Sequence, residues 1–431
     1  MKKIFFGLAL TFLSIGLFAQ EINFSGDLST NWGLYSPWTE EAWDFSLGKT
    51  DFTGAIEAYS GNSTCFFESS IGYDFAQSTL SASINEAYID YTESFWGIRI
   101  GRQKWAWGKA DGINITNSVF PEDSSSLFTE DSSLGLDSFR LSFYGNSFTL
   151  DAMWIPFFRG TVLPLEDSNP LKKYIVPETY TLSIPEYDLE KEIAISIGSI
   201  TEPELKIKNG EYALKASGYF RALDLSLYAF YGWDKSPILN YTGENLDMFG
   251  IPDTITVDAS YQRLTMFGLD VALPIGEFVL RSEGAFFPNR HFQTSADYIL
   301  SDGETSLKQN QLMGLAGLDW MPNGWTITAQ YYCDYVFNKS QDLDRTQDYI
   351  HGASLSISKT LLNESLNLSL SGILALNYYD SVITFDCDYS LSDQISLATG
   401  LYAFIPGPEE DGTYGKYKDL STIYIKAQYK F

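Results

Sequence analysis

The sequence predicts an all-β fold: a single transmembrane antiparallel up-and-down β-barrel of about 18 strands, with 16 as the alternative count. Three observations predict it. The chain ends in a strand with one apolar and one polar face, the same alternation recurs between turns of alternating length, and 16% of the residues are aromatic. After the N-terminal segment no apolar run reaches the length of a membrane helix, and in hydrocarbon only helices and closed barrels satisfy the backbone.

The N-terminus has the layout of a secretory signal peptide, which we expect to span residues 1–19. Lys2 and Lys3 precede an apolar run over residues 4–18, and Ala19 supplies a small residue before the expected cleavage point. The alternative is an uncleaved N-terminal anchor. The run is shorter than the roughly 20 apolar residues that a membrane helix needs. We therefore assign residues 20–431 to the barrel.

Acidic residues dominate the charge of the chain. With 55 Asp and Glu against 28 Lys and Arg, the formal net charge is −27. Nucleic acid is therefore excluded as an expected partner, because phosphate binding needs a basic surface. Acidic external loops or a lumen that prefers cations would each account for this charge.

The last predicted strand shows the alternation best. The apolar face and the polar face consist, respectively, of Ile423, Ile425, Ala427, Tyr429 and Phe431, and of Thr422, Tyr424, Lys426, Gln428 and Lys430. Such a final strand with a terminal aromatic residue is typical of outer-membrane barrels. We expect Tyr429 and Phe431 to form the assembly signal, with the barrel-assembly machinery as a partner during biogenesis.

Short and long connections alternate along the chain, as they do in membrane barrels with short periplasmic turns and long external loops. We expect short turns at 92–95, 145–146, 221–224, 274–277, 322–324, 361–364 and 390–393. We expect long loops at 106–132, 158–208, 235–258, 289–306, 338–346 and 406–418. An even strand number then places both termini in the periplasm. Residues 189–200 have the pattern of a strand that would break this parity, so we place them in a large external loop or folded into the lumen.

One local pattern is denser than the rest of the chain. It consists of three consecutive groups: Gly101-Arg102-Gln103 at the end of a strand, then Trp107-Gly108, then Asp111-Gly112. This pattern resembles a broad set of outer-membrane porin-like proteins, including alginate-export-type barrels and uncharacterised relatives. The resemblance covers about a fifth of the chain directly and implies a porin-like barrel, but the motif is poorly specific for a substrate.

A two-residue hairpin at 94–95 fixes the register of the strands beside it. It pairs Asp90 with Arg99 on the lumen side and places Tyr88 over Gly101. The same register turns Arg102 outward. A charge there costs roughly 2–4 kcal/mol at mid-bilayer and little near the rim. Arg102 should therefore lie near the external boundary, unless a bulge reverses the phase.

The segment after this strand contains two tryptophans and then several acidic residues. Trp105 and Trp107 fall where an aromatic girdle belongs, with sugar stacking as the alternative role. An early long loop of a porin can fold inward, so the candidates for a constriction are Asp111, Glu122 and Asp123. Their spacing is not that of an EF-hand, and we expect no metal and no cofactor.

The alternation, extended to all strands, gives a set of candidate pore-wall residues. On the predicted inner faces acids outnumber bases about two to one, which predicts a weak preference for cations. The candidates are Glu86, Tyr88, Asp90, Arg99, Gln103, Arg140, Lys215, Asp270, Arg281, Glu283, Asp386 and Asp388.

These features favour an outer-membrane channel for small hydrophilic solutes. The alternative is an export, structural or adhesive barrel, with polysaccharide export implied by the resemblance. A barrel enzyme is disfavoured, because the only histidines, His291 and His351, have no evident nucleophile or carboxylate partner, and we expect no catalytic residue. The expected partners are outer-membrane lipid, lipopolysaccharide and small polar solutes, and a homo-oligomer remains open.

Overall fold

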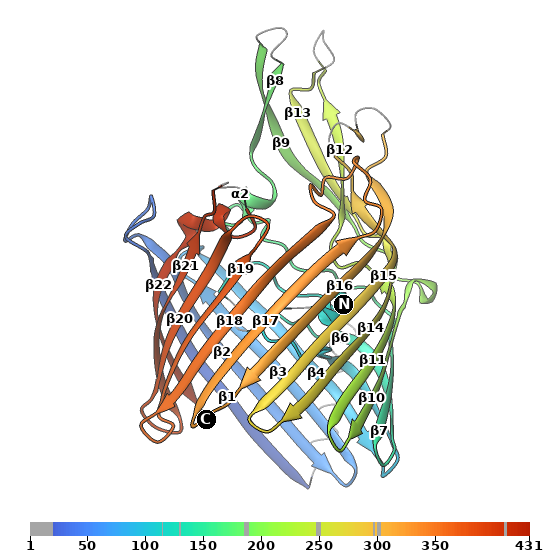
Figure 1. Cartoon of the computed structure of the whole chain (residues 1–431), viewed down its shortest axis with the longest axis vertical. Coiled ribbons are helices and arrows are strands. Elements are labelled where there is room, and N and C mark those ends of the chain that lie inside the picture. The colour runs from blue at the N-terminus through green and yellow to red at the C-terminus, as the bar shows by residue number, and fades with distance from the viewer. Residues whose placement is uncertain are drawn as a thin grey trace.

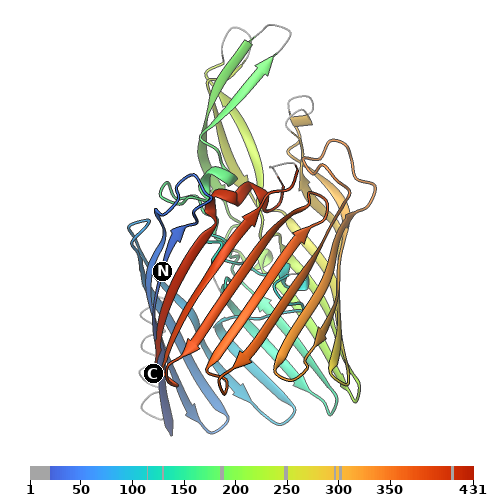
Figure 2. The same cartoon turned by 60° about the vertical axis from the view of Figure 1, so that its left-hand side comes forward.

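The computed structural model describes residues 20–113, 115–128, 131–184, 189–246, 251–295, 298–299, 303–408 and 412–431. Eighteen of its strands form one closed antiparallel barrel (Figures 1 and 2). Strand β1 (Glu21–Tyr35) closes the wall by pairing with β2 (Phe45–Ser60) on one side and with β22 (Thr422–Lys430) on the other. The predicted fold and the count of 18 are confirmed, and the alternative of 16 strands is wrong. The expected signal peptide at 1–19 lies outside the described residues.

The other barrel strands follow one another around the wall in chain order. They are β3 (Ser63–Asp74), β4 (Thr79–Thr92), β5 (Trp96–Gln103), β6 (Leu136–Tyr144), β7 (Phe148–Ile155), β10 (Glu211–Phe220), β11 (Leu223–Trp233), β14 (Arg263–Ile275), β15 (Phe278–Gln293), β16 (Ser306–Trp320), β17 (Trp325–Val336), β18 (Tyr349–Leu361), β19 (Leu366–Ala375), β20 (Asp380–Ser390) and β21 (Ile395–Ile405). All seven expected short turns join antiparallel neighbours. These turns lie at one end of the barrel, the short-turn end, and the longest connections lie at the other, the long-loop end (Figure 1).

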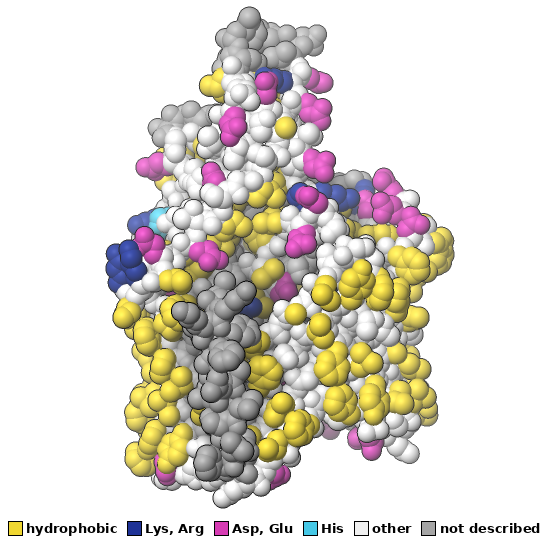
Figure 3. Space-filling model, turned by 180° about the vertical axis from the view of Figure 1, so that it is seen from behind, with side chains coloured by type: hydrophobic (Ala, Val, Ile, Leu, Met, Phe, Trp, Pro, Cys, Tyr) yellow, Lys and Arg dark blue, Asp and Glu magenta, His cyan; other side chains and the backbone are white. Residues whose placement is uncertain are grey.

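The barrel wall carries its apolar side chains outside and its polar side chains inside. In β22 the exposed fractions of Ile423, Ile425 and Tyr429 are 37%, 62% and 42%, whereas Thr422 is fully buried. Figure 3 shows hydrophobic side chains over the wall, with most of the charged side chains at and above the long-loop end. Among the described residues, no helix is long and apolar enough to cross a membrane.

Two long connections build a second sheet, which we call the tower, above the long-loop end (Figures 1 and 2). One connection supplies β8 (Thr179–Ile184) and β9 (Leu189–Thr201), and the other supplies β12 (Ile238–Glu244) and β13 (Thr254–Ser260). The order is β12-β13-β9-β8, with β9 and β13 parallel. The expectation that 189–200 form a strand outside the wall is confirmed, and the lumen alternative is wrong. The sequence did not predict β8, β12 or β13, which lie in ranges expected to be loops.

Buried ion pairs connect the base of the tower to the barrel rim. The Lys235 ammonium lies 2.7 Å from a carboxylate oxygen of Glu211, and both side chains are almost fully buried. Burial lowers the pKa of Lys235, and the charge of Glu211 opposes that shift. Beside them, Arg290 donates to Asp234 at 2.7 Å. A buried pair of this kind is costly to break from one side, so these contacts fix the path of the connection from β11.

The register predicted for the hairpin at 94–95 is confirmed. Asp90 is the partner of Arg99, and Tyr88 is the partner of Gly101. Gly101 has a φ of 131°, and a Cβ there would lie 2.2 Å from the carbonyl oxygen of Ala87, so the close approach of the two strands requires glycine. Arg102 is the last but one residue of β5, at the long-loop end. Its charge is paired with Asp137 at 2.9 Å.

Candidate pore and its constriction

Residues 104–135, which we call the inner segment, leave β5 and run into the barrel interior. Their short 3-10 helix η1 (Thr116–Val119) contacts the far wall rather than solvent. The N–H of Gly108 donates to the hydroxyl of Tyr228 on β11 at 3.2 Å, and the hydroxyl of Thr116 donates to Glu283 on β15 at 3.3 Å. Residues 114, 129 and 130 of this segment lie outside the described residues. An early long connection thus occupies part of the lumen.

Glu283 anchors the inner segment to the wall. Its side chain is only 4% exposed, and its carboxylate accepts the backbone N–H groups of both Lys109 and Ala110. Arg281, on the same strand, donates to the carbonyl of Lys109 at 2.9 Å. The Lys109 ammonium reaches Asp270 on β14 at 3.2 Å. Lys109 is therefore held at its N–H, its carbonyl and its side chain by three neighbouring wall residues.

A second clamp holds the tip of the inner segment. The amide of Gln330 on β17 donates to the carbonyl of Asp111 at 2.6 Å and accepts the Asp111 N–H at 3.1 Å. Both Asp111 and Gly112 are exposed. Gly112 has a φ of 70°, and a Cβ there would meet no heavy atom within 4 Å. The backbone of Asp111 is thus fixed by Gln330, while the residue as a whole is exposed.

Behind the tip, apolar side chains of the inner segment pack against one side of the wall. We call this group the inner cluster, and its buried members are Trp107, Ile115, Val119, Phe120, Leu136, Met153, Ile155, Ala213, Tyr228, Phe230, Leu264, Met266, Ala285, Phe287 and Leu315. The wall members come from β6 to β16. This side of the lumen is therefore filled by a packed core.

The prediction that Trp105 and Trp107 belong to an aromatic girdle is wrong. Trp107 is 4% exposed inside the barrel, and its ring centre lies 4.6 Å from that of Tyr228. Trp105 packs beside it at 5.3 Å. The inside–outside alternation of a strand holds only while the strand continues. Because β5 ends at Gln103 and the chain turns inward, both rings enter the lumen.

The three constriction candidates occupy different places. Asp111 stands at the tip, as described above. Glu122 and Asp123 lie farther along, where they form single bridges with Ser133 and Val162 respectively. Asp123 accepts the N–H of Ser125 at 3.0 Å. These two acids therefore organise the return of the inner segment beside the connection after β7, and the structure does not bring them together with Asp111.

The connection after β7 covers part of the mouth. It contains the single-turn helix α2 (Lys172–Ile175), and just before it Leu171 packs with Tyr35, Phe404 and Leu420 from the seam between the first and last strands. Asn169 donates to the carbonyl of Ser125 in the inner segment at 2.8 Å. The 3-10 helix η4 (Gly415–Leu420) contributes to the same group, and η3 (Ile207–Asn209) precedes β10.

A row of basic side chains lines the wall next to the inner segment. Arg99 donates to Asp90 at 2.7 Å, and its guanidinium lies 4.0 Å from the ring centre of Tyr88. Arg140 is the cross-strand partner of Arg99, and Lys215 lies 5.6 Å from the ring of Tyr228. Within the described part of the chain, Arg140 and Lys215 have no ion-pair partner. Asp151 on β7 is the cross-strand partner of Lys215, so these two cations have an acid nearby without forming a close ion pair with it.

The remaining candidates are spread around the wall. Gln103 is fully buried and donates to the carbonyl of Ser138, while Glu86 accepts the N–H of Lys104. Both therefore hold the start of the inner segment. Asp386 and Asp388 lie on β20, in the half that the inner cluster leaves free, and Asp386 accepts the hydroxyl of Tyr424.

A row of hydroxyl side chains, which we did not single out from the sequence, crosses the free half of the wall. Thr328, Ser356, Ser371 and Thr384 are successive cross-strand partners on β17 to β20. Gln330 and Ser354 continue the polar surface toward the tip of the inner segment, with a hydrogen bond of 3.1 Å. These residues share the inner face by alternation, and that regularity was visible in the sequence. The contact of Gln330 with Asp111 depends on the position of the inner segment, which the alternation does not give.

The histidines and carboxylates show no assembled reactive centre in the described ranges. His291 bonds to Ser306 at 3.0 Å, and His351 bonds to Tyr331 on the outer surface at 2.9 Å. No group of three or more His, Cys, Asp or Glu side chains in the described residues is placed to hold a metal ion.

Comparison with solved structures finds outer-membrane porins of the same fold. OccK8 (OprE) of Pseudomonas aeruginosa aligns with a TM-score of 0.52 and 10% identity, over 96% of this chain and 99% of that chain. OccAB1 of Acinetobacter baumannii gives 0.54 and 9%, over 96% and 97%. OpdL of P. aeruginosa gives 0.52 and 12%, over 95% and 99%. Sequence comparison gives no match to a protein family or to a curated protein. At such low identity the similarity establishes the shared fold alone.

Proposed function

We propose that this protein is an outer-membrane channel through which small hydrophilic solutes pass, with a weak preference for cations. The observation that carries the proposal is the inner segment: it packs on one side of the lumen and presents its tip, Asp111–Gly112, to open space. The hydroxyl row on the free half of the wall supplies hydrogen-bonding groups without a strong charge. A narrowed, polar passage of this kind suits solutes that shed little of their hydration.

Proteoliposomes test the proposal simply. Vesicles that contain the purified barrel should swell in an isosmotic solution of a small neutral sugar, at a rate that rises with the amount of protein. Vesicles prepared with heat-unfolded protein are the control. If loaded vesicles swell no faster than these controls, the channel proposal fails.

We propose that the short-turn end and both termini face the periplasm and that the tower faces the cell exterior. The alternation of short turns and long connections supports this orientation, because outer-membrane barrels have short periplasmic turns. Residues 1–19 are then the export signal, and the mature barrel begins near Gln20. Lipid, lipopolysaccharide and the assembly machinery are the corresponding partners.

We propose that nine of the twelve candidates named from the sequence line the pore, because Gln103, Asp270 and Glu283 are buried behind the inner segment. We assign the constriction to Asp111, with Glu122 and Asp123 shaping the path behind it. Together with Asp111, the lining set holds five carboxylates and four cations, and Asp386 and Asp388 lie on the free half of the wall. Arg140 and Lys215 oppose this excess locally. The balance supports a preference for cations that is weak rather than strict.

Removing single charges should shift this preference in opposite directions. Asp111→Asn should lower the permeability ratio of potassium to chloride, and Arg140→Gln should raise it. Each change should be roughly twofold, because a unit charge about 8 Å from an ion in water is worth about 0.5 kcal/mol. Reversal potentials in a potassium chloride gradient measure the ratio. Glu202→Gln, an exposed acid after β9, is the matched control and should change nothing. Equal shifts in all three variants would exclude a local role for these charges.

The exposed ring of Phe431 should contribute to assembly. Gly26 and Phe431 exchange two backbone hydrogen bonds of 3.0 Å at the seam, and the ring lies 6.2 Å from those of Phe52 and Tyr429. Phe431→Ala keeps the backbone bonds and removes the ring. We expect several-fold less folded barrel in the outer membrane, measured by heat-dependent gel mobility. Ile395→Ala, on the outer face of β21, should assemble normally. Normal assembly of Phe431→Ala would disprove the proposed signal.

The tower favours a second candidate function, an adhesive or structural barrel. It is a four-stranded sheet that rises above the mouth and contributes nothing to the barrel wall (Figure 2). Polysaccharide export rests on the sequence resemblance alone, and the acidic excess of the wall disfavours anionic polymers. An adhesin without a pore would give no swelling in the liposome assay, so the same measurement separates the two functions.

A further inference from the structure

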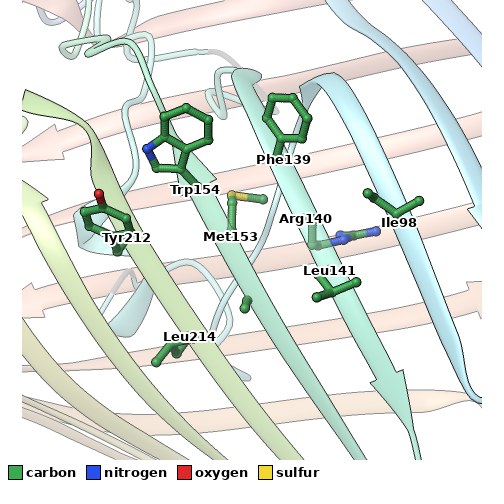
Figure 4. A pocket seen from close by; sticks show the side chains of 9 residues that line it. Ile98, Phe139, Arg140, Leu141, Met153, Trp154, Tyr212 and Leu214 are labelled. Atoms are coloured by element: carbon green, nitrogen blue, oxygen red, sulfur yellow. The ribbon is translucent and has the colours of Figure 1, made fainter. Parts of the chain in front are cut away.

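A hollow of about 340 Å³ lies in the wall formed by β5, β6, β7 and β10 (Figure 4). Its rim consists of two cross-strand rows, Phe139–Trp154–Tyr212 and Leu141–Ala152–Leu214, with Ile98 beside the second row. Phe139, Leu141, Tyr212 and Leu214 are 42%, 37%, 51% and 48% exposed, so the hollow opens to the outer surface of the barrel.

The sequence explains why the wall is hollowed here. Ala152 occupies the middle of the second row, between Leu141 and Leu214, and its side chain leaves a gap between larger neighbours. The aromatic rings of Phe139 and Trp154 stack at 5.7 Å and raise the side of the hollow nearer the long-loop end. The result is a groove with apolar walls, lined at its base by Met153 and Arg140, on a surface that faces hydrocarbon.

We infer that this groove binds an acyl chain of lipopolysaccharide, a proposal that rests on the membrane orientation given above. Inside a bilayer the hydrophobic effect does not drive apolar groups together, because the lipid tails are themselves apolar. What binds in this groove therefore depends on how closely it packs against the groove walls. A flexible hydrocarbon chain follows a concave apolar groove better than the convex wall of a second barrel does. A groove left unfilled would lose those contacts.

The position of the groove decides between the lipids of the two leaflets. Trp154 is the last but one residue of β7 and Tyr212 is the second residue of β10, so the groove lies in the half of the wall next to the long-loop end. In the proposed orientation that half contacts the outer leaflet. The Arg102–Asp137 pair lies on the same outer face, one step beyond Phe139 toward the long loops. Asp137 accepts two of the Arg102 N–H groups and the carbonyl of Ile84 accepts a third, and the remaining guanidinium N–H groups suit a lipid A phosphate.

Native mass spectrometry of the purified full-length protein tests the inference, with lipid A and phosphatidylethanolamine as the two probes. The wild type should retain lipid A in preference to phosphatidylethanolamine. Ala152→Phe fills the groove and should reduce the retained lipid A several-fold. Ala329→Phe adds the same ring at an exposed outer alanine on β17 and should retain lipid A as the wild type does. Arg102→Gln should reduce the preference for lipid A while leaving chain binding in place.

Several results would overturn the inference. One is equal lipid A retention by Ala152→Phe and wild type. Another is a wild-type preference for phosphatidylethanolamine. A loss of dimers or trimers in Ala152→Phe, without any loss of lipid, would make the groove a contact between copies. Ala152 faces outward, so its variant should fold and conduct like the wild type. Normal conductance with no lipid binding would reject the groove alone, whereas absent conductance in all variants would reject the channel.

Discussion

Replacing Glu283 by alanine should release the inner segment from β15 and raise the single-channel conductance. The carboxylate accepts the N–H groups of Lys109 and Ala110 and the hydroxyl of Thr116 in a site sheltered from water. Hydrogen bonds to a charged group contribute about 1.5–3 kcal/mol each, so the loss of even two of these three shifts the equilibrium between the bound and the released segment about a hundredfold or more. We expect larger and noisier current steps in planar bilayers.

Two further variants make this test specific. Glu283→Gln keeps one acceptor oxygen and should give an intermediate conductance. Glu57→Ala removes a carboxylate near the short-turn end of β2, away from the anchor on β15, and should leave the step size close to that of the wild type. If Glu283→Ala and Glu57→Ala conduct alike, then the anchor on β15 does not limit the pore.

Trp107→Ala should loosen the whole inner segment. The indole is 4% exposed, and its ring centre lies 4.6 Å from that of Tyr228 and 5.0 Å from that of Phe120. Truncating a buried aromatic residue to alanine costs about 3–5 kcal/mol, because it removes apolar contacts and leaves a cavity. Hydrogen exchange followed by mass spectrometry should show faster exchange in peptides from 104–128, with little change in the barrel strands.

The matched control is Trp325→Ala, which removes an indole that is 43% exposed on the outer wall. This variant should leave hydrogen exchange in the inner segment unchanged. Trp107→Phe keeps most of the apolar contact and should fall between the alanine variant and the wild type. If residues 104–128 exchange their amide hydrogens as slowly in Trp107→Ala as in the wild type, then the inner cluster does not hold the segment in place.

The barrel itself could be predicted from local sequence because each strand repeats one short-range rule. The two faces of the final strand, with Ile425 outside and Thr422 inside, follow directly from the period of two. The hairpin at 94–95 fixed the pairing of Asp90 with Arg99, because a tight turn leaves one register. The prediction of an outward Arg102 near the rim succeeded for the same reason, and Asp137 supplies the counter-charge that the prediction lacked.

The constriction could not be derived in this way because its contacts join distant parts of the chain. Glu283 and Gln330 hold the segment around Lys109 and Asp111 from strands far along the sequence. Two features of the sequence marked the start of the segment. The alternation stops after Gln103, and Asp111–Gly112 forms a turn. Extending the strand parity beyond that point put Trp105 and Trp107 on the wrong side of the wall.

The tower shows the same limit on the outside of the barrel. Strand β9 could be recognised from its alternation, but its parallel partner β13 lies in another connection. Two parallel strands must be joined by a long connection. Neither strand is therefore followed by a short turn from which the position of the other could be predicted. The polar composition of the ranges around β12 and β13 therefore predicted loops rather than strands.

Planar-bilayer recording on the purified wild-type barrel tests the central claim most directly. In a potassium chloride gradient the account predicts discrete conductance steps and a reversal potential that shows a modest preference for potassium. Bilayers that contain folded protein and show no steps would contradict the channel itself. Steps with a clear preference for chloride would contradict the assignment of an acidic pore wall around Asp111.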